Sequence, residues 1–202
     1  MEGGASPEPV PTADSPLALL YDHQGGTRLY AVNQTAQHKG LTPGMALADA
    51  RAICPDIQAR DAEPERDAAA LSMLAYWCQR YTPWSNVDGS DGLWLDISGC
   101  AHLFGGEQAL CQDIGRRLKT QGFHARLGLA DTPGAAWALA HTHRQAIAIA
   151  PPQQAAASLA PLPVAGLRLS DETLTLLRRF GLKTIGDLAG LPRHALARRF
   201  SR

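Results

Sequence analysis

The segment spanning residues 91–98 constrains the fold of this chain most tightly, because its side chains alternate between two kinds. Leu93, Leu95 and Ile97 are apolar, whereas the residue that follows each of them is an aromatic, an acid and a hydroxyl in turn. A period of two is typical of a β-strand that buries one face. Residues 99–106 then supply glycines and a turn before a segment with helical periodicity. We therefore predict a strand followed by a helix.

Strands and helices alternate along the rest of the chain, which predicts a layered α/β (α+β) fold. We expect strands at 17–21, 27–32, 84–88, 93–98, 124–130 and 147–149, and helices at 34–39, 46–53, 65–80, 107–120, from 132, at 171–180 and from 187. Residues 1–16 are rich in Pro, Gly and Ser, and we expect them to be disordered. Three units should follow, over 17–66, 67–150 and 151–202.

Four segments, in this order along the chain, together resemble one known family. They are residues 31–45, the Ile53-Cys54-Pro55 turn, the strand at 91–98, and residues 181–188. They are similar to the Y-family (translesion) DNA polymerases, and within them to the ImuB-like proteins of bacterial damage-induced mutagenesis. The resemblance runs from about residue 17 to about residue 200. It implies fingers over 17–66, a ferredoxin-like palm over 67–150 and the start of a helix-hairpin-helix thumb over 151–202.

The resemblance also implies where metal ligands should lie. Active members use three acidic residues to hold two metal ions that activate the primer hydroxyl and neutralise the triphosphate. Asp91 matches the aspartate of the family's Asp-Glu pair, and Gly92 occupies the glutamate position. The third acid belongs to a first palm strand for which we find no candidate near the N-terminus. We therefore expect no cofactor, with Mg²⁺ required only if the chain is an active polymerase and Asp91 as the one residual ligand.

The positions that hold the incoming nucleotide in active relatives also carry residues that argue against catalysis. Gln34 and Gln37 match a tyrosine and an arginine of the fingers helix, and a palm lysine position falls near Trp137. A neutral amide cannot replace the forked, charged contact of arginine with phosphate. Together these differences predict that catalysis has been lost.

Simpler interpretations of individual residues stay open. Asp91 is equally well explained as a turn residue. Asp96 fits a solvated polar position better than a metal ligand. His141 and His143 lack the nearby cysteines of a typical metal site and fit the surface at a helix end.

The charge balance changes along the chain although the net charge is zero. Residues 1–67 carry 10 acidic and 5 basic side chains, residues 68–157 carry 6 of each, and residues 158–202 carry 3 acidic and 8 basic ones. A basic C-terminal part favours a phosphate backbone as partner, and a solvated helix face is the alternative.

A helix ending at Gly181, a short turn and a second helix from Asp187 resemble a helix-hairpin-helix, in which turn amides accept a phosphate. Such a unit binds the DNA backbone without reading sequence. The first such hairpin of the family usually has two close glycines, and here Gly166 is the only one. This difference weakens the case for phosphate binding by that hairpin. The predicted DNA-binding residues are Arg168, Arg178, Arg179, Gly181, Lys183, Thr184, Gly186, Arg198 and Arg199.

Composition indicates a folded, cytoplasmic protein. A hydrophobic content of 45% supports a real core, and the four widely spaced cysteines form no CxxC pair. We expect reduced, mostly buried thiols in a cytosolic protein that is nucleoid-associated when bound to DNA. The sequence has neither an 18-residue apolar run nor a signal peptide, so we expect no membrane segment.

The functional hypothesis is a non-catalytic DNA-binding scaffold that helps to recruit an error-prone replicative-type polymerase in the damage response. By resemblance, a mutagenesis accessory protein and a sliding clamp are further partners, bound through regions beyond the thumb, and we expect the chain to be a fragment or shortened at both ends. Two alternatives stay open. One is an active translesion polymerase with Asp91 and Asp96 as its metal pair, although residues five apart on a strand face opposite sides. The other is a protein-interaction module that does not bind DNA.

Overall fold

The computed structural model describes residues 15–192, which divide into two compact units. One unit runs up to Leu74 and includes Gly89–Asp91, and the other comprises Ala75–Asp88 and the chain from Gly92 onward. Arg198, Arg199 and residues 1–14 of the segment 1–16 that we expected to be disordered lie outside the described residues. The last two residues of that segment are ordered, since the carbonyls of Ser15 and Pro16 accept hydrogen bonds from Asn33 and Gln58. The division into fingers, palm and thumb stays a prediction, since the contacts define two units.

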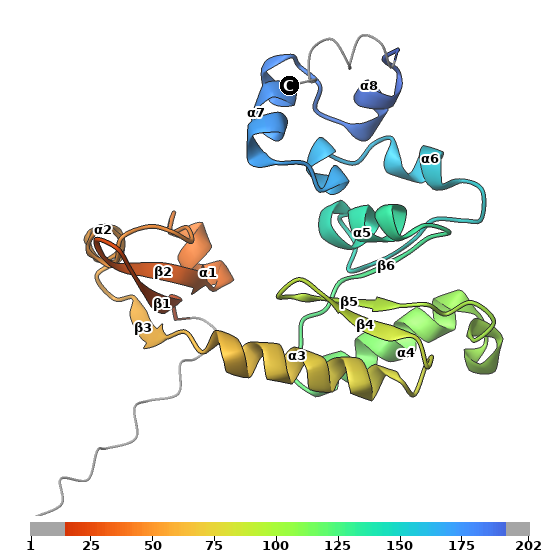
Figure 1. The fold of residues 1–202 in the computed structure, drawn as a ribbon, viewed down its shortest axis with the longest axis horizontal. Helices are drawn as coiled ribbons and strands as arrows, with labels where there is room; N and C mark the ends of the chain where they lie inside the picture. The colour runs from red at the N-terminus through yellow and green to blue at the C-terminus, as the bar shows by residue number, and fades with distance from the viewer. Residues whose placement is uncertain (1–14, 193–202) are drawn as a thin grey trace, which may run out of the picture. The chain divides into compact units, whose positions relative to one another are not determined.

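The first unit is built on a three-stranded sheet (Figure 1). β1 (Leu17–His23) pairs antiparallel with β2 (Gly26–Val32) and parallel with β3 (Gln58–Asp61). Two short helices, α1 (Gln34–His38) and α2 (Leu47–Ile53), lie between β2 and β3 in the chain. The apolar side chains of these elements form one core, whose buried members are Ala18, Leu29, Ala36, Leu41, Ala50, Cys54 and Ile57.

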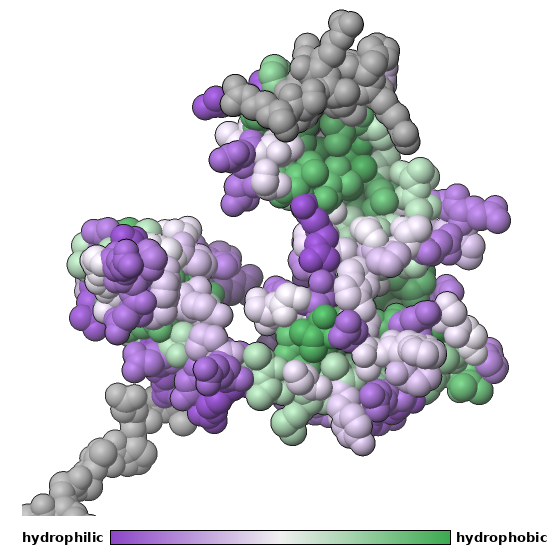
Figure 2. Space-filling model, viewed as in Figure 1, coloured by the Kyte–Doolittle hydropathy of each residue, from purple (hydrophilic) through white to green (hydrophobic). Residues whose placement is uncertain are grey.

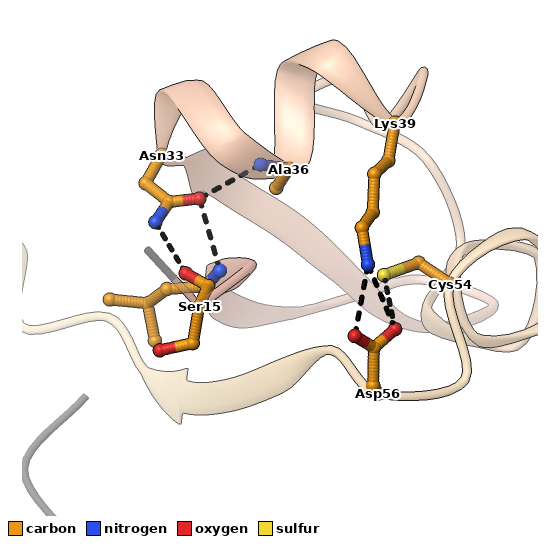
Figure 3. A network of polar contacts seen from close by, with 7 residues as sticks. Ser15, Asn33, Ala36, Lys39, Cys54 and Asp56 are labelled. Carbon is orange, nitrogen blue, oxygen red and sulfur yellow. Dashed lines mark hydrogen bonds and ion pairs between the residues drawn. The ribbon is translucent and has the colours of Figure 1, made fainter. Parts of the chain in front are cut away.

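Polar side chains fix both ends of α1 (Figure 3). The Asn33 side-chain oxygen accepts hydrogen bonds from the amides of Ala36 (2.9 Å) and Leu17 (3.1 Å), so it caps the helix and ties it to β1. Beyond the other end, Lys39 donates to the Asp56 carboxylate at 2.9 Å, and the Cys54 thiol donates to it at 3.1 Å. The lysine is the main cause that lowers the pKa of Asp56 to about 2.

α3 (Pro64–Cys78) leads from the first unit into the second, which opens with a β-hairpin. β4 (Ser85–Asp88) and β5 (Gly92–Leu95) pair antiparallel, with Asp88 opposite Gly92. The predicted strand therefore ends at Leu95, two residues before Ile97, and the next residues enter the one-turn 3₁₀ helix η1 (Ala101–Phe104). α4 (Glu107–Thr120) follows as predicted and buries Leu110, Cys111, Ile114 and Leu118 along one face.

A second pair of strands carries the helix α5 (Pro133–Thr142). β6 (Leu127–Leu129) and β7 (Ile147–Ile149) are parallel, and among the described residues they form a sheet separate from β4–β5. α5 lies very close to β6, because a Cβ at Gly128 would stand 2.6 Å from the Ala140 nitrogen and would overlap the Ala136 carbonyl oxygen. Only glycine permits this approach of strand and helix.

The C-terminal part of the second unit is helical (Figure 1). It comprises α6 (Ala155–Leu159), the 3₁₀ turn η2 (Val164–Leu167), α7 (Asp171–Arg179) and α8 (Ile185–Ala189). Two of these assignments differ from the sequence analysis, since α6 was not predicted and α8 begins at Ile185. Gly181 has φ +77° just after α7, which agrees with its predicted role in ending that helix. A small core of Val164, Leu174 and Leu177 holds these elements together.

A polar network in the second unit joins the loop after α3 to α4. The Tyr81 hydroxyl donates to Asp113 at 2.9 Å, and Arg116 and Arg117 donate to the same carboxylate. Burial, followed by the contact with Asp113, raises the pKa of Tyr81 to about 12. Arg117 is the main cause that lowers the pKa of Asp113 to about 2, with contributions from Arg116 and Tyr81.

We expect Asp113→Asn to lower the pKa of Tyr81 while leaving it above the usual value near 10, because burial of the phenol remains. In the parent protein the depressed carboxyl pKa stabilises the fold fully above about pH 4, and this contribution is lost as the pH falls towards 2. The stability of the variant should not show this loss between about pH 4 and pH 2. Ultraviolet titration of the phenolate, with Tyr81→Phe to assign the signal, measures the first effect. An unmoved Tyr81 titration in Asp113→Asn would contradict the network.

Candidate functional site

The hairpin at residues 85–95 carries the acids that a two-metal site would need. Asp91 is exposed in the turn before β5, and Asp96 is exposed just after it. Five residues of extended chain separate them by about 16 Å, too far for one metal pair. Asp96 also accepts a hydrogen bond from the Ser98 amide at 2.9 Å, and the Ser98 side chain, followed by this amide, lowers the pKa of its carboxyl. The rearranged metal pair therefore has no support in this geometry.

Gly92 is built into the hairpin. A Cβ at this position would stand 2.9 Å from the Asp88 carbonyl oxygen, closer than side-chain carbons approach in real structures. The residue that matches a metal-binding glutamate therefore serves a tight strand pairing instead. Within residues 15–192, no group of three or more His, Cys, Asp or Glu side chains is placed to hold a metal ion.

The residues that match nucleotide contacts lie on two helices in different units. Gln34 and Gln37 are both exposed on α1, whose buried residue is Ala36. Trp137 is half-buried on α5 and stacks on the exposed His141 ring, with the ring centres 3.8 Å apart. The other histidine of this end, His143, accepts from the Gln145 amide at 3.2 Å.

The turn between α7 and α8 differs from a phosphate-accepting hairpin in one respect. The amides of Lys183 and Thr184 both donate to the Asp187 carboxylate, at 3.1 and 2.9 Å, and Thr184 and Asp187 form a capping box. The next two amides, those of Ile185 and Gly186, donate to the carbonyls of residues 162 and 160. Every amide that we expected to face a phosphate thus has a partner within the protein.

Side chains of the same region present a cationic surface. Arg178 and Arg179 are exposed at the end of α7, and Lys183 is exposed in the turn after it. Among the described residues, no ion pair involves these three side chains. α7 buries Leu174 and Leu177 against the rest of the unit. The helix therefore directs its apolar face inward and its charges outward.

The remaining residues expected at this surface have other contacts. Gly166 is buried against α5, where a Cβ would stand 3.2 Å from the Ala138 Cβ, so it serves packing. Arg168 forms an ion pair with Asp88, with its Nη1 atom 3.0 Å from Oδ2. Sequence reasoning missed Asp88 as a site residue, because an acid before glycine resembles an ordinary turn and its partner lies 80 positions away.

Three further findings test the sequence analysis. All four cysteines are unpaired, and Cys54, Cys78 and Cys111 are buried, which confirms the expectation of mostly buried thiols. Of the helices that the structure describes, none combines the length and apolar character needed to cross a bilayer. The α/β fold is confirmed by its likeness to solved structures.

The fold is that of Y-family polymerases. An insertion ternary complex of Dbh DNA polymerase matches with a TM-score of 0.78 and 15% identity, over 93% of this chain and 56% of that one. A crystal structure of DinB from Sulfolobus solfataricus matches with a TM-score of 0.71 and 15% identity, over 91% and 55%. At such identities the likeness concerns the fold.

Sequence comparison supports the same family. The Protein ImuB of Caulobacter vibrioides (strain NA1000 / CB15N) is 49% identical over 161 residues, which are 80% of this chain and 35% of that protein. The DNA polymerase IV of Moorella thermoacetica is 27% identical over 168 residues, 80% of this chain and 41% of that protein. The chain thus spans less than half of either relative. The model of the impB/mucB/samB family matches residues 11–141, and the chain belongs to that family.

Proposed function

We propose that this chain is part of a non-catalytic, DNA-binding scaffold that acts in damage-induced mutagenesis by helping an error-prone polymerase. One observation carries the proposal. The fold of a translesion polymerase is retained, whereas the positions matching its metal and triphosphate ligands hold Gly92, Gln34, Gln37 and Trp137. The strong similarity to a protein named ImuB supports the role in mutagenesis.

DNA binding would rest on side chains of α7 and the following turn. Arg178, Arg179 and Lys183 contribute three exposed cations, while the turn amides are already bonded within the protein. Such cations contact phosphates without reading base sequence. A mutagenesis accessory protein, a replicative-type polymerase and a sliding clamp are the further partners we propose, and they would bind regions of the full-length protein outside this chain.

Primer extension and DNA binding, measured in the same samples, test the proposal. We expect a labelled primed template to bind, with anisotropy that falls as salt rises, and no extension with nucleotides and Mg²⁺ or Mn²⁺. Gly92→Glu should also fail to extend the primer, because the new Cβ meets the Asp88 carbonyl oxygen. Extension that is lost in Asp91→Ala would establish the alternative, an active polymerase related to the polymerase IV enzymes.

Charge-neutral variants test which cations contact DNA. Replacing Arg178, Arg179 and Lys183 together by Gln should reduce the slope of log affinity against log salt by up to about 2.7, because each duplex phosphate contact contributes about 0.9. The matched control replaces three other exposed cations by Gln, at the positions Arg51, Lys119 and Arg144. An equal loss in the control would show a general charge effect. Absence of DNA binding in the parent chain would favour a protein-interaction module.

A further inference from the structure

An ion pair between Arg168 and Asp88 links the helical C-terminal part of the second unit to the β4–β5 hairpin. Arg168 Nη1 lies 3.0 and 3.2 Å from the two carboxylate oxygens, and Nη2 lies 3.2 Å from Oδ1. The guanidinium thus grips Asp88 through two nitrogens, a strong form of ion pair. Figure 2 shows strongly hydrophilic side chains directly below the hydrophobic surface at α7 and α8.

Groups other than Asp88 also hold Arg168 in place. Its backbone occupies the left-handed region, with φ 53°, directly after η2. η2 is anchored on α5 through Gly166, which is buried against Ala138. The guanidinium carbon also lies 5.1 Å from the centre of the Trp137 ring, which attracts cations through its face. Loss of the carboxylate would therefore leave the cation in position.

The two partners differ in their access to solvent. The Arg168 side chain is 49% exposed, whereas that of Asp88 is 18% exposed. An anion from solution can thus approach the guanidinium, while the carboxylate is largely shielded from solvent. As long as Asp88 is charged, the pair is neutral, and Arg168 contributes little attraction for another anion.

The position of Arg168 suits a phosphate of the same DNA strand that the end of α7 would contact. Arg168 precedes α7, and Arg178 and Arg179 lie in its last turn. The nine residues of this helix span about 13 Å at 1.5 Å per residue. That length corresponds to about four nucleotide steps of 3.4 Å.

We propose that Arg168 is a latent DNA-phosphate site that Asp88 masks. The Asp88 carboxylate competes with a backbone phosphate for the guanidinium, so the free protein keeps this cation neutralised. DNA must displace the carboxylate to recruit it. The proposal rests on the DNA-binding function proposed above. It adds that the Asp88 carboxylate competes with DNA for one cation of the binding surface.

Asp88→Asn tests the mask, because asparagine keeps the shape and loses the charge. We expect the variant to bind a fluorescein-labelled duplex oligonucleotide about three- to tenfold more tightly than the parent near 0.1 M salt, with a salt slope steeper by about 0.9. Arg168→Gln alone should change binding by less than about twofold, since the cation is already engaged. Adding Arg168→Gln to Asp88→Asn should remove the gain.

The controls separate this proposal from the proposed function. Asp171→Asn removes the same charge from an exposed position three residues after Arg168 and should leave the salt slope unchanged. An equal gain in DNA affinity in Asp171→Asn would contradict masking of Arg168 by Asp88. A gain in Asp88→Asn that persists when Arg168→Gln is added would contradict it as well. So would unchanged binding by an Asp88→Asn protein whose circular dichroism is native. If neither the parent nor Asp88→Asn binds DNA, the DNA-binding function itself fails.

Discussion

Gly128→Ala should destabilise the second unit by about 3 kcal/mol, the upper end of overpacking costs and a large share of the stability of a typical domain. The added methyl group would meet the backbone of α5 at Ala136 and Ala140, and backbone cannot rotate aside as a side chain can. Either β6 or α5 must shift, which would disturb the neighbouring core of Ala138, Leu139 and Ala148. Urea unfolding followed by tryptophan fluorescence measures the loss, since Trp137 lies on α5.

Gly134→Ala is the matched control on the same helix. A Cβ at Gly134 would have no heavy atom within 4 Å. Alanine favours helix over glycine by roughly 0.5 to 1 kcal/mol, so this variant should be as stable as the parent or more stable. Equal stabilities of the two variants would contradict the close approach of β6 and α5.

Leu177→Ala should cost about 3 kcal/mol in the stability of the helical C-terminal part. Leu177 is 1% exposed and packs with Val164 and Leu174 in the small core under α7. Truncation to alanine would remove the contacts of this side chain and leave a cavity among its neighbours. Hydrogen exchange of the α7 amides should accelerate by roughly a hundredfold if that free energy is lost locally.

The neighbouring residue supplies the control. Leu176 is 40% exposed, so Leu176→Ala should cost less than about 1 kcal/mol. Under the proposed function, Leu177→Ala should also weaken DNA binding, because Arg178 and Arg179 depend on an ordered α7. Comparable exchange rates in the two variants would argue against the assigned inward face.

Local patterns predicted most of the elements that position the candidate site. The alternation at 93–95 gave β5, the spacing of Leu110, Ile114 and Leu118 gave α4, and Gly181 marked the end of α7. Each of these signals depends on neighbours in the chain, where periodicity and turn chemistry act directly. The α/β class followed from their order.

Elements without a local signal were missed. β3 contains Gln58, Arg60 and Asp61, so it lacks the apolar alternation of a half-buried strand and exists through its pairing with β1. α6 follows two prolines and resembled a linker. Its short alanine-rich sequence gives neither a cap nor a periodic face.

The candidate site depended on contacts between distant residues, which one sequence does not display. Nothing near Arg168 indicates that its partner is Asp88, and the partners of the Ile185 and Gly186 amides belong to a segment more than twenty residues earlier. These contacts decide which cations face solvent and which turn amides are free. The chemical character of these residues was therefore predictable from the sequence, whereas which of their groups are free to bind a partner was not.

The geometry at Gly92 has an evolutionary consequence. A substitution to glutamate would bring the side chain a metal site needs, yet it would first push against the carbonyl of Asp88, 2.9 Å from the new Cβ. The hairpin would have to relax through a second change before the acid became tolerable. A single substitution to glutamate at this position is thus expected to strain the β4–β5 pairing before it could supply a metal ligand.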